Sequence, residues 1–143
     1  MRYSLLDRSI EKNGVLDTAK ELGITIIAYS PLEQGILTGK FHEDPIKLKS
    51  IGGFRRFMSS FREKSLERTR PLVEALKQVA AQHNASAAQV ALAWVIRRHG
   101  QSVVAIPGAS SVSQVESNAA AMELDLSEDE IERLAGVAER IRA

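Results

Sequence analysis

The sequence predicts an α/β fold in which helices pack around a parallel sheet. Two segments, residues 24–28 and 103–106, are β-branched and almost wholly apolar, as in strands that are buried on both faces of a parallel sheet. Segments with apolar residues at helical spacing lie before, between and after them. Strands that alternate with helices are typical of right-handed βαβ units, and a chain of 143 residues can enclose one core of this kind.

The amino-terminal part is predicted to contain a strand, a helix and a second strand. Residues 3–6 form a short apolar run that ends in a charged pair, which indicates a strand. Residues 11–22 have apolar side chains at helical spacing, and Gly23 can adopt the left-handed conformation that ends a helix. The strand of residues 24–28 follows directly.

The long segment of residues 33–61 is predicted to be irregular. Glycines, Pro45 and scattered basic and aromatic side chains interrupt any periodic pattern in it. A loop of this length inside a compact domain is usually a lid, a binding loop or a disordered segment. Its basic pair Arg55-Arg56, between Phe54 and Phe57, is more typical of solvated surface than of a nucleic-acid site.

Helices dominate the remainder of the chain. A helical pattern covers residues 66–82, in which Pro71 is either an early-turn residue or a kink. A helix over residues 86–99 precedes the strand of residues 103–106, and two more helices close the chain. Each of these last three helices begins with the pattern of a capping box: Ser86 with Gln89, Ser111 with Gln114, and Ser127 with Glu130.

Composition and charge exclude several classes of protein. Nineteen basic and eighteen acidic side chains leave a net charge of +1, which gives no electrostatic case for nucleic acid or an anionic membrane as the main partner. The chain has no cysteine, so disulfides and thiolate metal sites are excluded, and a reducing cytoplasm fits. No apolar run is long enough to span a bilayer, so the expected compartment is the cytoplasm.

Several other kinds of site are not supported by the sequence. His42, His83 and His99 are far apart and lack the spacing of metal ligands. Nothing in the pattern brings Ser4 and Asp7 beside a histidine as a catalytic triad. No GxGxxG or Walker A sequence is present, so neither a Rossmann nor a P-loop assignment holds.

The first candidate site follows the strand of residues 24–28. Proteins of the α/β class bind ligands just beyond the carboxyl ends of their strands. Tyr29 could offer a flat ring for stacking, and Ser30 with nearby backbone N–H groups could receive a pyrophosphate. A strand end packed by Tyr29 and a turn set by Pro31 is the alternative that needs no ligand.

The second candidate site follows the strand of residues 103–106. Gly108 permits a close approach of the backbone, and Ser110, Ser111 and Ser113 offer hydroxyl groups. The start of the following helix would favour a phosphate, because free N–H groups and the positive end of the helix dipole meet there. Helix capping alone would also explain Ser111 and Gln114.

These segments, in this order, resemble the aldo-keto reductase family, an NADPH-dependent (β/α)8 barrel. The resemblance spans almost the whole chain. It rests on Tyr-Ser-Leu-Leu-Asp-Arg at 3–8, Ala-Tyr-Ser-Pro-Leu at 28–32, Gly-Ile-Leu-Thr-Gly-Lys at 35–40, Ala-Gln-Val-Ala-Leu-Ala-Trp at 88–94, Ile-Pro-Gly-Ala at 106–109 and Leu-Ser-Glu-Asp-Glu-Ile at 126–131. It implies that residues 1–143 form a single domain, a partial TIM barrel of the last three βα units, strands 6–8, with the carboxyl-terminal helix.

The resemblance also implies a set of NADP(H)-binding residues. Tyr29 would stack on the nicotinamide ring, Ser30 and Leu32 match pyrophosphate contacts, and Gln34 and Gly35 begin a loop, residues 33–61, that covers the cofactor. In the second segment, the residues that match contacts to the adenosine 2′-phosphate and to adenine are Gly108, Ser110, Ser111, Gln114 and Asn118. Other members carry Lys or Arg where this chain has Gly108 and Gln114, which leaves the preference for NADPH over NADH open.

The reaction of the family implies what this chain lacks. In the family, hydride passes from NADPH to a carbonyl while a tyrosine, assisted by Lys, Asp and His, donates the proton. No residue here matches that catalytic set, and neither Tyr3 nor Tyr29 is that tyrosine. The resemblance therefore implies a fragment of an oxidoreductase that is inactive alone and acts on a small aldehyde or ketone only when an amino-terminal half completes it. The alternative is a non-catalytic interaction module, which pairs through open sheet edges with a partner or as a homo-oligomer.

Overall fold

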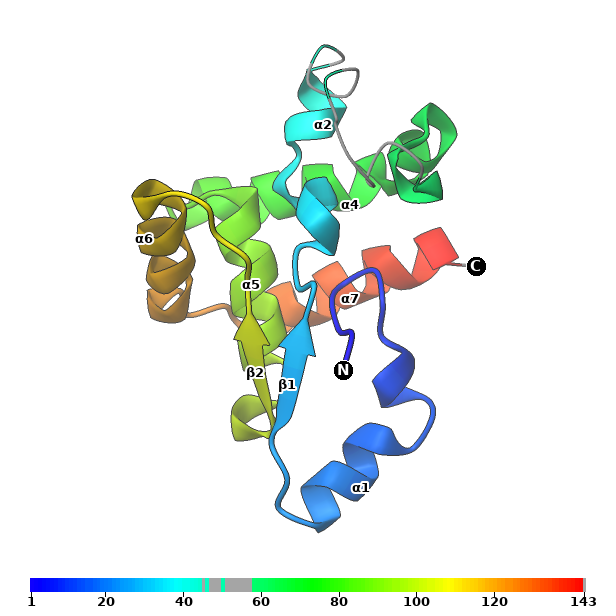
Figure 1. Cartoon of the computed structure of the whole chain (residues 1–143), viewed down its shortest axis with the longest axis vertical. Coiled ribbons are helices and arrows are strands. Elements are labelled where there is room, and N and C mark those ends of the chain that lie inside the picture. Colours follow the sequence, from blue (N-terminus) through cyan, green and yellow to red (C-terminus); the bar gives the residue numbers. More distant parts are fainter. Residues whose placement is uncertain (45, 47–49, 51–57, 143) are drawn as a thin grey trace.

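The structure, a computed structural model, describes residues 1–44, 46, 50 and 58–142. In these residues two strands, β1 (Ile26–Tyr29) and β2 (Val103–Ile106), form one parallel sheet. Of three longer helices, α4 (Glu63–Gln82) packs against both α5 (Ala87–Arg97) and α7 (Glu128–Arg142). In the view of Figure 1, α5 and α7 lie behind the strands and α4 crosses above their arrowheads. The parallel pairing confirms the predicted alternation of strands and helices.

The described part of the chain covers only one face of the sheet. Ile26, Ala28 and Val103 are buried in the main core, on the side of the helices. The alternate side chains are between 44% and 56% exposed: Ile27, Tyr29, Val104 and Ile106. The prediction that both strands are buried on both faces is therefore wrong, because the described helices cover only one side of this sheet.

The strand predicted over residues 3–6 is reduced to a single bridge. Arg2 pairs with Tyr29 in parallel, and the N–H of Tyr3 donates to the carbonyl of Tyr29 at 3.4 Å. The hydroxyl of Ser4 then accepts hydrogen bonds from the N–H groups of Leu6 (3.1 Å) and Asp7 (3.0 Å). These local bonds close a turn, so the backbone leaves the sheet after residue 3.

The helix predicted over residues 11–22 is shorter than expected. A 3-10 turn, η1 (Ser9–Glu11), is separated from α1 (Val15–Glu21) by a loop that contains Gly14. Gly14 adopts φ +83°, a left-handed conformation that interrupts the helical backbone and that glycine adopts at little cost.

The segment of residues 33–61 is partly helical where the structure describes it. It contains η2 (Glu33–Thr38), α2 (Lys40–Glu43) and η4 (Ser59–Phe61). The prediction of an irregular segment is thus wrong for these residues, because their apolar side chains form a small cluster with α4: Ile36, Phe41, Phe61 and Leu66. The pair Arg55-Arg56 with its two phenylalanines lies outside the described residues.

The helices of the carboxyl-terminal half begin close to where their caps predict. Ser86 and Gln89 form a reciprocal capping box at α5, and Ser127 and Glu130 form one at α7. Pro71 lies inside α4, so it is not an early-turn residue. Two 3-10 turns, η5 (Gly100–Ser102) and η6 (Ala121–Glu123), and the helix α6 (Val112–Ala120) complete this half.

The main core lies between the covered face of the sheet and helices α4, α5 and α7. Trp94 of α5 is its largest fully buried side chain, and Tyr3 packs against it with 5.7 Å between ring centroids. Among the described residues, no helix is both long and apolar enough to cross a membrane.

Candidate functional site

The two predicted sites begin at the same edge of the sheet. β1 and β2 run in parallel and in register, so that Tyr29 stands opposite Ile106 at the last pair of the ladder. The arrowheads of both strands in Figure 1 mark this edge. From it the chain continues into η2 after β1 and toward α6 after β2. Residues 30–35 and 107–118, which lie more than seventy positions apart in the sequence, therefore start side by side.

Tyr29 is available to a ligand at this edge. It is the last residue of β1, and its side chain is half exposed on the uncovered face of the sheet. The other half of the side chain is covered at the strand end, so the stacking role and the packing alternative both stay predictions. An exposed ring flanked by the side chain of Ile106 can stack on a planar aromatic group.

The backbone after β1 takes a turn that most residues avoid. Ser30, Glu33 and Gln34 have φ values of +54°, +48° and +55°, and Gly35 has +102°. Non-glycine residues in this region cost about 1–3 kcal/mol each, and such residues concentrate at binding sites. Two backbone hydrogen bonds lie within the turn: the N–H of Glu33 donates to the carbonyl of Ser30 (3.0 Å) and that of Gly35 to the carbonyl of Leu32 (2.9 Å).

A polar cluster of Arg2, Ser4 and Glu33 lies beside this turn, with Ser4 and Glu33 buried and the Arg2 side chain 44% exposed. The carboxylate of Glu33, a residue only 7% exposed, accepts hydrogen bonds from the Ser4 hydroxyl at 2.8 Å and from Arg2, which binds both oxygens. Sequence analysis missed this cluster, because its members are about thirty positions apart and no local spacing marks them.

The second segment is an exposed helix start. The hydroxyl of Ser111 accepts from the N–H of Gln114 at 3.3 Å, which makes Ser111 the N-cap of α6. The side chain of Gln114 accepts from the N–H (2.7 Å) and the hydroxyl (3.1 Å) of Ser110 instead of closing a capping box on Ser111. Gly108, Ser110, Ser111 and Gln114 are exposed and Asn118 is half-buried, so these residues are accessible from solvent.

The glycines of the two segments differ in a way that can be tested. A Cβ added at Gly35 would lie 3.3 Å from the Phe41 ring on a backbone of φ +102°, whereas nothing lies within 4 Å of one added at Gly108. Gly35→Ala is expected to lower the free energy of unfolding by about 1–3 kcal/mol. Gly108→Ala, its matched control, should change it by no more than about 0.5 kcal/mol in urea denaturation. Equal losses in the two variants would contradict this account of the turn.

The helix α2 is attached to α4 by a buried histidine. Nε2 of His42 lies 2.9 Å from the hydroxyl of Thr69, and both side chains are buried. Burial lowers the pKa of His42, and the positive charges of Arg70 and Lys77 lower it further. His42 is therefore neutral at neutral pH and serves packing in this arrangement.

The three histidines do not converge. His83 pairs with Glu130 at 2.8 Å and His99 with Glu11 at 3.0 Å, while His42 contacts Thr69. The described residues contain no group of three or more His, Cys, Asp or Glu side chains that could hold a metal ion. The hydroxyl of Ser4 donates to Glu33 and not to a histidine.

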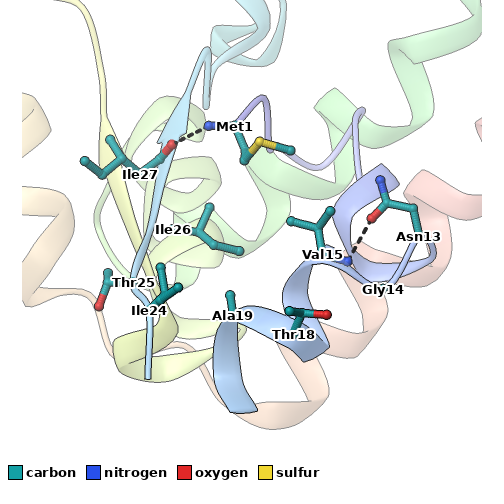
Figure 2. Close-up of a pocket in the computed structure, with 10 residues that line it drawn as sticks. All are labelled: Met1, Asn13, Gly14, Val15, Thr18, Ala19, Ile24, Thr25, Ile26 and Ile27. Carbon is teal, nitrogen blue, oxygen red and sulfur yellow. Dashed lines mark hydrogen bonds between the residues drawn. The ribbon is translucent and has the colours of Figure 1, made fainter. Parts of the chain in front are cut away.

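A hollow in the described surface lies away from the strand ends. It has a volume of about 600 Å³ and opens between α1 and the amino-terminal half of β1. Figure 2 shows Val15 and Ala19 of α1 facing Ile24 and Ile26 across it. Since it contains none of the predicted site residues, we assign the candidate site from the strand ends and not from this hollow.

Comparison with known proteins gives one consistent family. The model of the Aldo/keto reductase family matches residues 1–139. A probable pyridoxal reductase 2 of Schizosaccharomyces pombe is 39% identical over 132 residues, which are 91% of this chain and 40% of that protein. The NADH-specific methylglyoxal reductase of Escherichia coli is 30% identical over 140 residues, or 98% of this chain and 41% of that protein.

The solved structures agree on the fold. The structure of a glycerol dehydrogenase from Gluconobacter oxydans matches 97% of this chain with a TM-score of 0.82 and 23% identity, over 41% of its own length. This likeness confirms the predicted fold class, a partial TIM barrel. The chain spans about 40% of the length of the relatives it matches. By the family match over residues 1–139, the chain belongs to the aldo/keto reductase family.

Proposed function

We propose that this chain binds NADP(H) across the carboxyl ends of β1 and β2, as the cofactor-binding part of an oxidoreductase that reduces aldehydes or ketones. The observation that carries the proposal is the parallel register of the two strands, in which Tyr29 and Ile106 end side by side. Ligands of α/β proteins bind at this edge of the sheet.

The residues at this edge fit the parts of a nicotinamide dinucleotide. The exposed ring of Tyr29 suits stacking on nicotinamide. The turn that contains Ser30, Leu32, Gln34 and Gly35 offers a hydroxyl and a sharply turned backbone to the pyrophosphate, and the chain after it, residues 33–61, would cover the cofactor.

The start of α6 suits the adenosine end of the cofactor. An exposed helix N-terminus favours a phosphate, and hydroxyl or amide groups stand beside it on Ser110, Ser111 and Gln114. Gly108 would let the backbone approach the ligand, and Asn118, further along α6, could reach adenine.

The preference between NADPH and NADH depends on this second segment. Residues 107–118 contain no Lys or Arg, so a 2′-phosphate would be held by hydroxyl groups and the helix terminus alone. We infer a modest preference for NADPH, and a relative whose name specifies NADH is compatible with a small margin between the two.

The bound cofactor would supply hydride to a carbonyl carbon. The residues of this chain would bind and orient the nicotinamide, but none matches the catalytic Tyr, Lys, Asp and His of the family. We therefore propose that the chain alone holds cofactor without reducing carbonyl compounds, and that a small carbonyl substrate is bound and protonated by residues supplied from elsewhere.

Titration of the 143-residue chain with NADPH and with NADH tests this function. Saturable binding, followed by cofactor fluorescence and thermal shift, is expected to weaken roughly tenfold in Tyr29→Ala and to persist in Tyr29→Phe, because base–aromatic stacking contributes about 1–3 kcal/mol. Ser111→Ala should also weaken NADPH binding. Its matched control is Ser127→Ala, which removes the corresponding cap of α7.

The opposite outcome would favour the second candidate function. If millimolar cofactor does not bind, the uncovered apolar face of Ile27, Tyr29, Val104 and Ile106 becomes the leading candidate for function. An exposed apolar patch of this kind is typical of association, here with a second copy of the chain, and the mass in solution would then exceed that of a monomer.

A further inference from the structure

The buried carboxylate of Glu33 is an unusual feature beside the proposed pyrophosphate turn. An ionised side chain is seldom buried unless it is paired, and this one receives three hydrogen bonds from residues 2 and 4. Arg2 binds both carboxylate oxygens, and Ser4, which is fully buried, binds one of them at 2.8 Å. Nothing in the proposed reaction uses Glu33 directly.

The backbone at Glu33 needs an external constraint. Ser30, Glu33 and Gln34 all adopt positive φ, a conformation that persists only where the surrounding structure enforces it. Glu33 lies within this run, and its side chain points away from solvent into contact with Arg2 and Ser4. The side-chain bonds thus connect the strained turn to the segment that pairs with the edge of β1 at Arg2.

The negative charge of Glu33 also affects the binding of an anionic ligand at the turn. A carboxylate beside a turn that receives a pyrophosphate would repel the ligand unless its charge is balanced. Arg2 balances it through a bidentate ion pair, and Nε of Arg2 also lies 3.5 Å from Oδ2 of Asp7. Its guanidinium is thereby shared between two acids, and in this arrangement Arg2 acts on the turn through Glu33.

We propose that Arg2, Ser4 and Glu33 form a positioning clamp that holds the turn of residues 30–35 in its ligand-binding conformation. The inference rests on the proposed function, because the ligand it concerns is the nicotinamide cofactor. Glu33 is a positioning residue: its carboxylate touches Arg2 and Ser4 and shapes the backbone that meets the ligand.

Two readouts on the 143-residue chain test the clamp. The first is hydrogen exchange without cofactor at the amides of Gly35 and Leu37, both of which donate to the carbonyl of Leu32. The second is the Kd for NADPH. The variants are Arg2→Ala, Glu33→Ala and the double variant, and the matched control is Glu21→Ala, an exposed acid on α1. Unfolding in urea shows that each variant remains folded.

The clamp predicts an order of effects that a general loss of stability would not produce. The double variant should bind NADPH roughly tenfold more weakly than the parent chain, a change of about 1.4 kcal/mol. Arg2→Ala alone should bind NADPH more weakly than the double variant does, because it leaves the carboxylate of Glu33 without its cation beside the ligand. The amides of Gly35 and Leu37 should exchange faster in all three variants, while the exchange rates of the α5 amides stay unchanged. In the control Glu21→Ala, the exchange rates of all these amides should equal those of the parent chain.

Other results would overturn the clamp. Unchanged exchange at Gly35 and Leu37 would show that the turn does not need these side chains. Losses of affinity that simply add in the double variant would show that Arg2 and Glu33 act independently. If the parent chain binds no cofactor, the proposed function fails by itself, and the exchange measurement still decides whether the clamp holds the turn.

Discussion

Replacing Glu11 by Gln is expected to lower the free energy of unfolding by about 3–5 kcal/mol, because it removes the acid at the centre of a buried charge cluster. Glu11 accepts hydrogen bonds from Tyr3 (2.5 Å), His99 (3.0 Å) and Arg8, whose Nε and Nη2 lie 2.9 and 2.6 Å away. Arg8 is only 8% exposed, so the variant leaves its cation buried beside a neutral amide. Urea denaturation followed by circular dichroism measures the loss.

The same variant should remove part of the acid sensitivity of the fold. Burial alone would raise the pKa of Glu11, but the hydrogen bonds from His99, Arg8 and Tyr3 outweigh burial and lower it. A carboxyl whose pKa is lower in the folded chain stabilises it fully above the unfolded pKa, and this contribution falls as the pH drops below about 5. The parent chain should therefore lose more stability between pH 6 and pH 3 than Glu11→Gln does.

A variant of an exposed acid is the control for this test. Glu21→Gln on α1 changes the same chemical group at the surface and should shift stability by no more than about 0.5 kcal/mol at any pH. Glu130 also has a lowered pKa, but it is present in both the parent chain and Glu11→Gln, so its contribution to the pH dependence cancels in the comparison. Parallel pH curves for the parent chain and Glu11→Gln would mean that the cluster does not bind Glu11 in its ionised form.

The features that were predictable from sequence are those with local causes. The strand Val103–Ile106 and the start of α6 were placed correctly, since a β-branched run and a serine N-cap act over a few neighbouring residues. The parallel direction of the two strands follows from the βαβ rule, and it brought the predicted segments after Tyr29 and Ile106 to one edge. The assignment of cofactor contacts at that edge stays a prediction.

The features that were missed have distant causes. Whether a strand is buried on one face or two depends on what packs against it, and the composition of residues 24–28 is the same in both cases. The strand predicted at residues 3–6 ends early because the Ser4 hydroxyl captures two backbone N–H groups. The contacts of Glu33 with Arg2 and of Glu11 with His99 join residues 31 and 88 positions apart, beyond any local pattern.

Replacing Trp94 by Ala is expected to destabilise the chain by about 3–5 kcal/mol, the usual cost of emptying a large buried aromatic site. Trp94 is fully buried in α5, its ring packs against Tyr3, and its indole N–H donates to the carbonyl of Ile131 in α7 at 3.0 Å. It therefore connects α5 both to α7 and to the amino-terminal segment. Since a domain is typically stable by about 5–15 kcal/mol, such a loss is a large share of the total, and the urea concentration at the midpoint of unfolding should fall accordingly.

Trp94→Phe separates the two parts of this cost. Phe keeps an aromatic ring at the site but removes the indole N–H that donates to the carbonyl of Ile131, and the loss of this hydrogen bond should cost about 0.5–1.5 kcal/mol. Met122→Ala, at a side chain that is 66% exposed, is the control and should change little. Trp94 is the only tryptophan of the chain, so the variants must be followed by circular dichroism and not by indole fluorescence. If Phe destabilises as much as Ala does, the hydrogen bond to α7 contributes more than ring packing, and the link between α5 and α7 is chiefly polar.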